Sequence, residues 1–189
     1  MRQFKHVIIS LSLFLMCLLP MIASAATFVF PYEGFRYTQQ DDELVLTQTN
    51  LSEHADFIES LGTSADAVLA NYQANNTIME IITPDGAQIA ISVSQHPYLS
   101  GTAALDDLTD ADQAALLEQF TSSGLYEECT LVKGAPSYLR LTSSAMYASM
   151  PVYSIRYITM AYGKLYTLSE TVIGRMVEAS DDLALQNVY

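Results

Sequence analysis

Apolar residues, many of them β-branched or aromatic, gather in several short stretches that polar and turn residues bound, which is the pattern of β-strands. The stretches are TFVF, FRYT, LVLT, TIMEIIT, QIAISVS, YEECTLVK, SYLRLTSSAMY, PVYSIRYITM and KLYTLSETVI. Pro84-Asp85-Gly86 separates two of them and predicts a hairpin turn, because proline presets φ and glycine accepts a positive φ. The last four follow one another closely and predict an antiparallel β-meander, with Tyr162-Gly163 in a two-residue turn.

Between the early strands and the first hairpin, apolar residues recur at helical spacing. Ser52 is expected to cap a short helix that runs through Ile58 and ends at Gly62. Thr63 is expected to open a second helix, with Asp66 at the reciprocal position of a capping box. Its apolar face carries Ala65, Val68, Leu69 and Tyr72.

A further helix is expected after Thr109, which can cap it, with Asp112 at the reciprocal position and Gly124 as its stop. Its apolar side is expected to carry Ala111, Ala114, Ala115, Leu117 and Phe120. This order of elements predicts an α/β fold of the α+β type: a mostly antiparallel β-sheet with a C-terminal four-strand meander, flanked by helices. No internal repeat or low-complexity linker interrupts residues 26–189, so a single domain is expected there.

Residues 1–25 have the pattern of a secretory signal peptide. Arg2 and Lys5 form a basic start, an apolar run follows at 7–19, and 23–25 offers the small residues that signal peptidase requires. The apolar run is shorter than the roughly 20 residues that span a bilayer. We therefore expect cleavage and a secreted, extracytoplasmic location at the cell envelope. A retained segment would instead make the protein a signal-anchored component of the cell surface.

The charge of the chain argues against two classes of partner. The sequence has 8 basic and 21 acidic residues, and cleavage would remove Arg2 and Lys5, which leaves six basic residues and a net charge of −15. A surface this acidic repels the phosphates of nucleic acids and anionic lipid headgroups. We expect no nucleic-acid partner and no membrane insertion after signal cleavage.

The cysteine content indicates that the hydrophobic core, rather than disulfides, stabilises the domain. Cys17 lies in the signal segment, so the mature chain holds Cys129 alone and cannot form an internal disulfide. Within EECTLV, Cys129 is expected to be a strand residue that faces the core; the alternative, a reactive thiol, is disfavoured by its acidic neighbours. Zinc patterns are absent from the sequence, and LDDLTDAD lacks the ligand spacing of a calcium loop. No metal and no cofactor are expected.

Motifs of the common hydrolases are also absent. The sequence contains no GxSxG elbow, no SxxK and no HExxH. His54 and His96 are the two histidines of the mature chain. Because catalytic triads assemble from residues distant in sequence, a hydrolase with a site that includes His54 or His96 is kept as an alternative to a non-catalytic domain.

Tyrosines recur at alternating positions of the meander, in a chain without tryptophan. The turn at Tyr162-Gly163 predicts three cross-strand pairs: Thr159 with Tyr166, Tyr157 with Leu168, and Ile155 with Glu170. A turn near Ala148 predicts that Arg140 lies opposite Arg156.

This arrangement offers a candidate ligand surface. Arg140 and Arg156 could hold an anion, and Tyr138, Tyr153, Tyr157 and Tyr166 could surround it, since a tyrosine ring packs while its hydroxyl reaches a partner. Tyrosine also favours strands intrinsically, so these residues can instead be ordinary cross-strand neighbours under helices. The second interpretation is favoured and the first is kept as the alternative.

Two stretches carry a resemblance to known proteins. FPYEGFRYT and SAMYASMPVYSIRYITMAYGKLYTLSETVIG resemble a group of uncharacterised exported proteins of anaerobic Gram-positive bacteria. The order of elements resembles the PsbP/Mog1/DcrB-type α/β/α sandwich, whose members, as the resemblance implies, mostly bind or stabilise other proteins. It implies no site residue. We therefore expect a secreted, non-catalytic domain that binds another envelope protein or a small ligand, or that acts as an accessory factor at the cell envelope.

Overall fold

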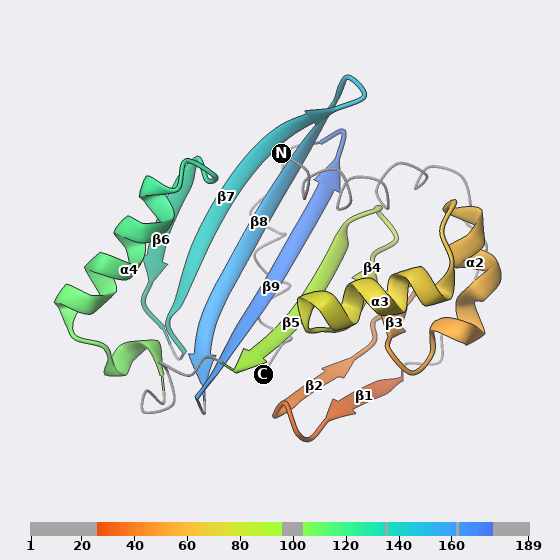
Figure 1. The fold of residues 1–189 in the computed structure, drawn as a ribbon, viewed down its shortest axis with the longest axis horizontal. Helices are drawn as coiled ribbons and strands as arrows, with labels where there is room; N and C mark the ends of the chain where they lie inside the picture. The colour runs from red at the N-terminus through yellow and green to blue at the C-terminus, as the bar shows by residue number, and fades with distance from the viewer. Residues whose placement is uncertain (1–25, 96–103, 135, 162, 176–189) are drawn as a thin grey trace.

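The computed structural model describes residues 26–95, 104–134, 136–161 and 163–175. Within these ranges, seven strands form one antiparallel sheet in the order β3-β4-β5-β9-β8-β7-β6 (Figure 1). The strands are β3 (Leu44–Thr47), β4 (Thr77–Ile82), β5 (Gln88–Gln95), β6 (Glu128–Val132), β7 (Tyr138–Tyr147), β8 (Met150–Ala161) and β9 (Lys164–Ile173). The predicted fold class, an α+β fold with a mostly antiparallel sheet and a C-terminal meander, is confirmed.

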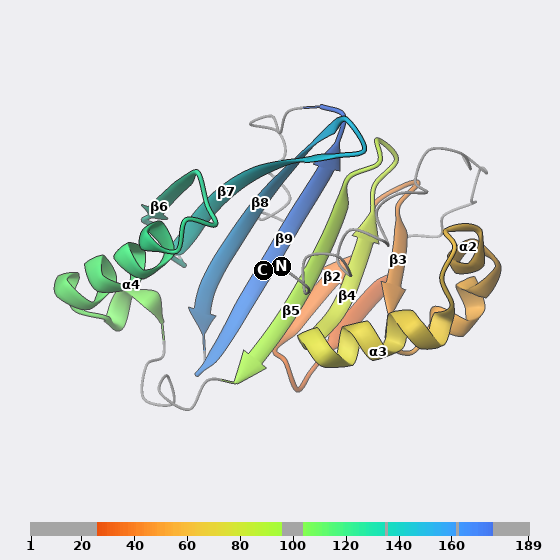
Figure 2. The same ribbon diagram turned by 45° about the horizontal axis from the view of Figure 1, so that its top comes forward.

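A hairpin of β1 (Thr27–Phe30) and β2 (Phe35–Thr38) forms a separate two-stranded sheet. The helices are η1 (Leu51–His54), α2 (Ala55–Ser60), α3 (Ala65–Asn75), η3 (Leu105–Asp107) and α4 (Asp110–Ser122). In Figure 2, α3 and α4 lie in front of the large sheet, while β1 and β2 pass behind it. We refer to the first side as the helix face and to the second as the hairpin face.

Cross-strand pairing assigns each strand residue to one of the two faces. One row of neighbours on the helix face is Leu141, Arg156, Ser169, Ala90, Glu80 and Leu46. The adjacent row on the hairpin face is Arg140, Tyr157, Leu168, Ile91, Met79 and Thr47. Side chains in the two rows therefore point to opposite sides of the sheet.

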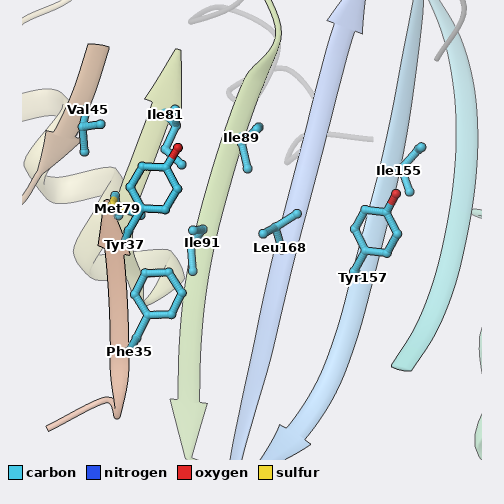
Figure 3. Close-up of a cluster of buried hydrophobic side chains, with 10 residues drawn as sticks. All are labelled: Phe35, Tyr37, Val45, Met79, Ile81, Ile89, Ile91, Ile155, Tyr157 and Leu168. Carbon is cyan, nitrogen blue, oxygen red and sulfur yellow. The ribbon is translucent and has the colours of Figure 1, made fainter. Parts of the chain in front are cut away.

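Three apolar clusters among the described residues join the layers. On the hairpin face, Phe35 and Tyr37 of β2 pack over the centre of the sheet (Figure 3). The sheet residues of this cluster are Val45, Met79, Ile81, Ile89, Ile91, Ile155, Tyr157 and Leu168. On the helix face, Ile58 of α2 and Tyr72 of α3 pack against β3 and β4, and α4 packs against β7 and β8.

The starts of the first two helices differ from the prediction. Ser52 caps no helix, because the 3-10 turn η1 precedes α2 and contains this residue. The second helix, α3, begins one residue later than expected, since Ser64 rather than Thr63 accepts a hydrogen bond from the backbone N–H of Ala67 at 3.2 Å. Its predicted apolar face is confirmed, because Ala65, Val68, Leu69 and Tyr72 all belong to the cluster on β3 and β4.

Thr109 caps α4 as predicted, with its hydroxyl accepting from the backbone N–H of Asp112 at 3.2 Å. The predicted apolar side was wrong in part: Ala111, Ala114 and Ala115 are exposed, whereas Leu116, Leu117 and Phe120 face the sheet. Gln113, only 7% exposed, lies on the buried side. Its amide nitrogen donates to the carbonyl of Leu105 at 3.1 Å and to that of Leu108 at 3.3 Å. A polar residue can face inward here because these carbonyls need a donor.

Candidate functional site

A pocket of about 510 Å³ lies between the β1–β2 hairpin and strands β7, β8 and β9 on the hairpin face; we call it the hairpin pocket. Its floor includes Ile91, Tyr157 and Leu168, which are at most 4% exposed. From the hairpin it is lined by Val29, Phe30, Pro31, Gly34, Phe35 and Arg36. From the meander it is lined by Tyr138, Thr159, Ala161, Tyr166 and Thr167. Arg36 is the one charged side chain among the described lining residues.

The loop of the hairpin is tied to β9 at the edge of this pocket. The Tyr166 hydroxyl donates to the backbone carbonyl of Glu33, and the Lys164 ammonium donates to the carbonyl of Tyr32. Gly34 adopts a φ of 69° in the same loop, a conformation that glycine accepts at no steric cost. The roof of the pocket is thus held to the sheet by hydrogen bonds as well as by packing.

The second strand of the hairpin is fixed by a hydrogen bond at its far end. The Tyr37 hydroxyl donates to the Glu43 carboxylate at 2.6 Å. Burial raises the pKa of Tyr37 above its ordinary value of 10.0, and the bond to Glu43 and its negative charge add to this. Tyr37 therefore stays a neutral donor, and the hairpin keeps this anchor over the whole physiological pH range.

The polar atoms of the pocket are largely used by the protein itself. The Thr159 hydroxyl donates to the carbonyl of Ser137 at 2.7 Å, and the Tyr166 hydroxyl is bonded to the hairpin. Tyr138 and Tyr157 pack edge to face, with ring centroids 5.8 Å apart and an interplanar angle of 71°. What the pocket presents is therefore mainly aromatic and aliphatic surface, which suits an apolar molecule.

The structure brings together three of the six residues of the candidate ligand surface. Tyr138, Tyr157 and Tyr166 line the hairpin pocket. Arg140 is the cross-strand neighbour of Tyr157, but its guanidinium lies 3.6 Å from the Glu128 carboxylate. Tyr153 shares this face of the sheet, opposite Ser144, and is outside the described lining.

The prediction that Arg140 lies opposite Arg156 was wrong. Arg140 pairs with Tyr157, and Arg156 pairs with Leu141. The turn holds two residues, Ala148 and Ser149, both with positive φ of 47° and 70°, whereas the predicted pairing required an odd number. A one-residue change of register turns a side chain to the other face. The two arginines therefore lie on opposite sides of the sheet, while the three pairs predicted between β8 and β9 are confirmed.

The sequence analysis did not predict that residues of the β1–β2 hairpin line the pocket. Phe30 and Phe35 pair across the hairpin, with ring centroids 5.9 Å apart, and both line the pocket. The alternation of TFVF and FRYT places the aromatic residues of both strands on one side of the hairpin, so this signal was present in the sequence. The alternation alone does not identify the strands against which the aromatic side of the hairpin packs.

The residues of the hydrolase alternative are not brought together by the described part of the chain. His54 lies half-buried in η1, and the structure records no hydrogen bond or ion pair between its side chain and any described residue. His96 and the signal segment 1–25 lie outside the described residues. The hydrolase stays a prediction.

Cys129 lies half-buried on β6 and packs against the cluster under α4, as expected. In the same described ranges, no three His, Cys, Asp or Glu side chains are grouped so that they could hold a metal ion. Nor do these ranges contain a helix with the length and apolar character needed to cross a membrane.

No protein-family model and no curated protein matches the chain. A crystal structure from Bacteroides thetaiotaomicron is similar with a TM-score of 0.50 and 14% identity, covering 84% of this chain and 45% of that one. The chain thus spans less than half of that protein, and at this identity the likeness shows the fold alone. The solution structure of cyanobacterial PsbP (CyanoP) from Synechocystis is similar with a TM-score of 0.39 and 12% identity, covering 92% of this chain and 96% of that one. A PsbP-type protein is therefore among the similar structures, at a score too low to carry an argument about function.

Proposed function

We propose that this chain is a secreted, non-catalytic domain of the cell envelope that binds a small, mainly apolar ligand in the hairpin pocket. The observation that carries the proposal is the pocket itself, about 510 Å³ in volume and lined by aromatic rings from both the hairpin and the meander. Pockets for small molecules typically have about 300–1,000 Å³ and a mostly apolar lining with a few polar groups.

The chemistry of the lining favours one kind of ligand. The hydroxyls of Thr159 and Tyr166 are bonded within the protein, so the deep part of the pocket offers packing rather than free donors. Arg36 belongs to the exposed side of β2 and supplies the charge at the rim. A ligand with an apolar body and a polar or anionic end at the rim would match this distribution.

Export belongs to the same proposal and is supported by the sequence of residues 1–25. Membership of the exported proteins of anaerobic Gram-positive bacteria also belongs here, on the two stretches that resemble them. Mass spectrometry of the protein recovered from its producing cell tests export: we expect a chain that begins at Ala26. A chain that retains residues 1–25 would favour the signal-anchored alternative.

Binding is tested with N-phenyl-1-naphthylamine, a neutral apolar fluorophore, added to the purified exported chain. We expect saturable binding of one molecule per chain. Ala161→Trp would fill the pocket and weaken binding at least about tenfold, because Ala161 is part of the lining. Ala145→Trp is the matched control, since Ala145 is exposed on β7 and is not among the described lining residues.

The proposal is wrong if the wild-type chain shows no saturable binding. It is also wrong if Ala161→Trp and Ala145→Trp bind the fluorophore equally well while both keep the far-UV circular dichroism of the wild type.

A further inference from the structure

Arg156 lies on the helix face and is held by neutral groups. Its Nε donates to the Ser169 hydroxyl at 3.1 Å, and one terminal nitrogen donates to the Tyr126 hydroxyl at 2.8 Å. The guanidinium carbon lies 5.9 Å from the centroid of the Tyr126 ring, within cation–π range. These contacts fix the position of the guanidinium without neutralising its charge.

Three other cations near the meander have acidic partners, whereas Lys164 donates to the backbone carbonyl of Tyr32. Arg140 lies 3.6 Å from Glu128, Lys133 lies 3.9 Å from Asp106, and Arg175 pairs with Asp85 at 2.5 Å. Arg156, although half-buried, has no carboxylate within ion-pair distance among the residues that the structure describes. In a chain with 21 acidic residues, a half-buried cation with only neutral partners is unexpected, because desolvated charges are usually paired.

Toward β9 the neighbours of Arg156 are small and polar, whereas its neighbour on β7 is the buried Leu141. On this face, Ser154 and Thr171 are cross-strand neighbours, as are Arg156 and Ser169, and Thr167 and Ser92. The large apolar residues of the helix face gather to either side, under α4 and under α2 and α3. Figure 2 shows β9 between these helices, with neither α3 nor α4 in front of it. Arg156 is thus the cation beside a strip of hydroxyl groups.

We propose that Arg156 is an anion-binding residue, and that this strip of β8, β9 and β5 takes a small carboxylate-bearing molecule. Arginine has five N–H donors, and the two bonds to Ser169 and Tyr126 use two of them. The remaining donors form a planar fork that matches the two oxygens of a carboxylate. Nearby serine and threonine hydroxyls can donate to the same oxygens.

The charge of the site favours a monoanion. Arg156 is the one cation on this strip of the helix face in the described part of the chain, and the mature chain carries an expected net charge of −15. A single guanidinium balances one negative charge, whereas a phosphate dianion would meet the repulsion of the chain with half of its charge unbalanced. The site lies across the sheet from the hairpin pocket, so this inference does not rest on the proposed function.

The test is a titration of the ¹⁵N-labelled exported chain with sodium acetate, sodium benzoate and, for comparison, sodium sulfate at constant ionic strength, followed by NMR. We expect saturable shifts at the Arg156 Nε and at the backbone amides of Ser169 and Thr171. Arg156→Lys keeps the charge but loses the fork, and it should weaken binding at least about tenfold. Arg156→Gln should abolish it. Arg140→Gln, on the opposite face, should leave it unchanged.

Three results would overturn the inference. The first is a shift that does not saturate, or that is the same in Arg156→Gln as in the wild type. The second is tighter binding of sulfate than of either carboxylate, which would contradict the assignment to a monoanion. The third is loss of these shifts in Ala161→Trp, which would place the bound carboxylate in the hairpin pocket.

Discussion

The buried hydrogen bond between Tyr72 and Glu80 should couple the stability of the domain to pH. Glu80 is 9% exposed beneath α3, and the Tyr72 hydroxyl donates to its Oε2 at 2.7 Å. The Gln88 side-chain amide donates to Oε1. Burial raises the pKa of Glu80 above 4.5, and the bond from Tyr72 opposes this rise. Burial also raises the pKa of Tyr72, with the negative charge of Glu80 adding to it, so the phenol remains a donor.

The loss of stability caused by Tyr72→Phe depends on the charge of its partner, Glu80. A hydrogen bond to an ionised group contributes about 1.5–3 kcal/mol, and one between neutral groups contributes about 0.5–1.5 kcal/mol. Below the folded pKa of Glu80, where it is protonated, Tyr72→Phe should cost about 1 kcal/mol; above that pKa, where it is ionised, it should cost about 2–3 kcal/mol. In the Glu80→Gln background the cost should stay near the lower figure both below and above that pKa, since the partner is then neutral throughout.

The sign of the pH dependence follows from the direction of the shift. The folded pKa of Glu80 lies above its unfolded value of about 4.5. Its contribution to stability is therefore fully present below pH 4.5 and is lost as the pH rises through the folded pKa, at about 1.4 kcal/mol for each unit of the shift. Glu80→Gln removes this loss, so its stability relative to the wild type should increase between pH 4.5 and pH 8.

Urea unfolding followed by far-UV circular dichroism measures all four proteins of this double-mutant cycle. If Tyr72→Phe costs the same in both backgrounds at pH 8, the two side chains are not coupled. If Glu80→Gln and the wild type change in parallel with pH, the pKa of Glu80 is not raised by folding.

Two further changes test other parts of the structure. Ala148→Asn with Ser149→Gly should stabilise the domain by about 1–2 kcal/mol in urea unfolding, because both positions have positive φ and an Asn-Gly pair suits such a turn; an unchanged or lowered midpoint would contradict this turn. Tyr166→Phe removes the bond to the Glu33 carbonyl, so it should cost about 1 kcal/mol and speed proteolysis of the hairpin loop. Tyr153→Phe is its control, and equal cleavage rates in the two variants would show that the bond does not hold the loop.

The strand register of the meander was predictable where the residues of the turn favour a positive φ. Gly163, with a φ of 74°, marks the turn between β8 and β9, and the pairs derived from it are confirmed. Ala148 and Ser149 also adopt positive φ, but neither residue type favours that region. The sequence therefore contains no sign that this turn has two residues, and the register between β7 and β8 was predicted one residue out.

The prediction of which side of α4 faces the sheet was wrong for a different reason. The alanines of α4 add to the apolar count of one side although they bury little surface, whereas Gln113 is buried because it bonds the carbonyls of Leu105 and Leu108. Those carbonyls belong to the segment before the helix, so the requirement for a donor is a tertiary one. The same holds for the hairpin pocket, since the alternation of β1 and β2 identifies an aromatic side but not the strands that it covers.

The register of β7 and β8 also separates the two proposed binding sites. With the arginines opposite each other, one anion could have contacted both; with Arg140 and Arg156 on opposite faces, the backbone of the sheet separates them. Arg140 is neutralised by Glu128 beside an aromatic surface, while Arg156 retains its charge beside hydroxyl groups. The two faces therefore suit different ligands, one apolar and one anionic. Among the described residues the two sites meet along β8, where Arg156 and Tyr157 are consecutive, and along β9, where Leu168 and Ser169 are consecutive. Both strands are paired on both sides. A strand held in this way transmits little movement, so the two ligands should bind independently.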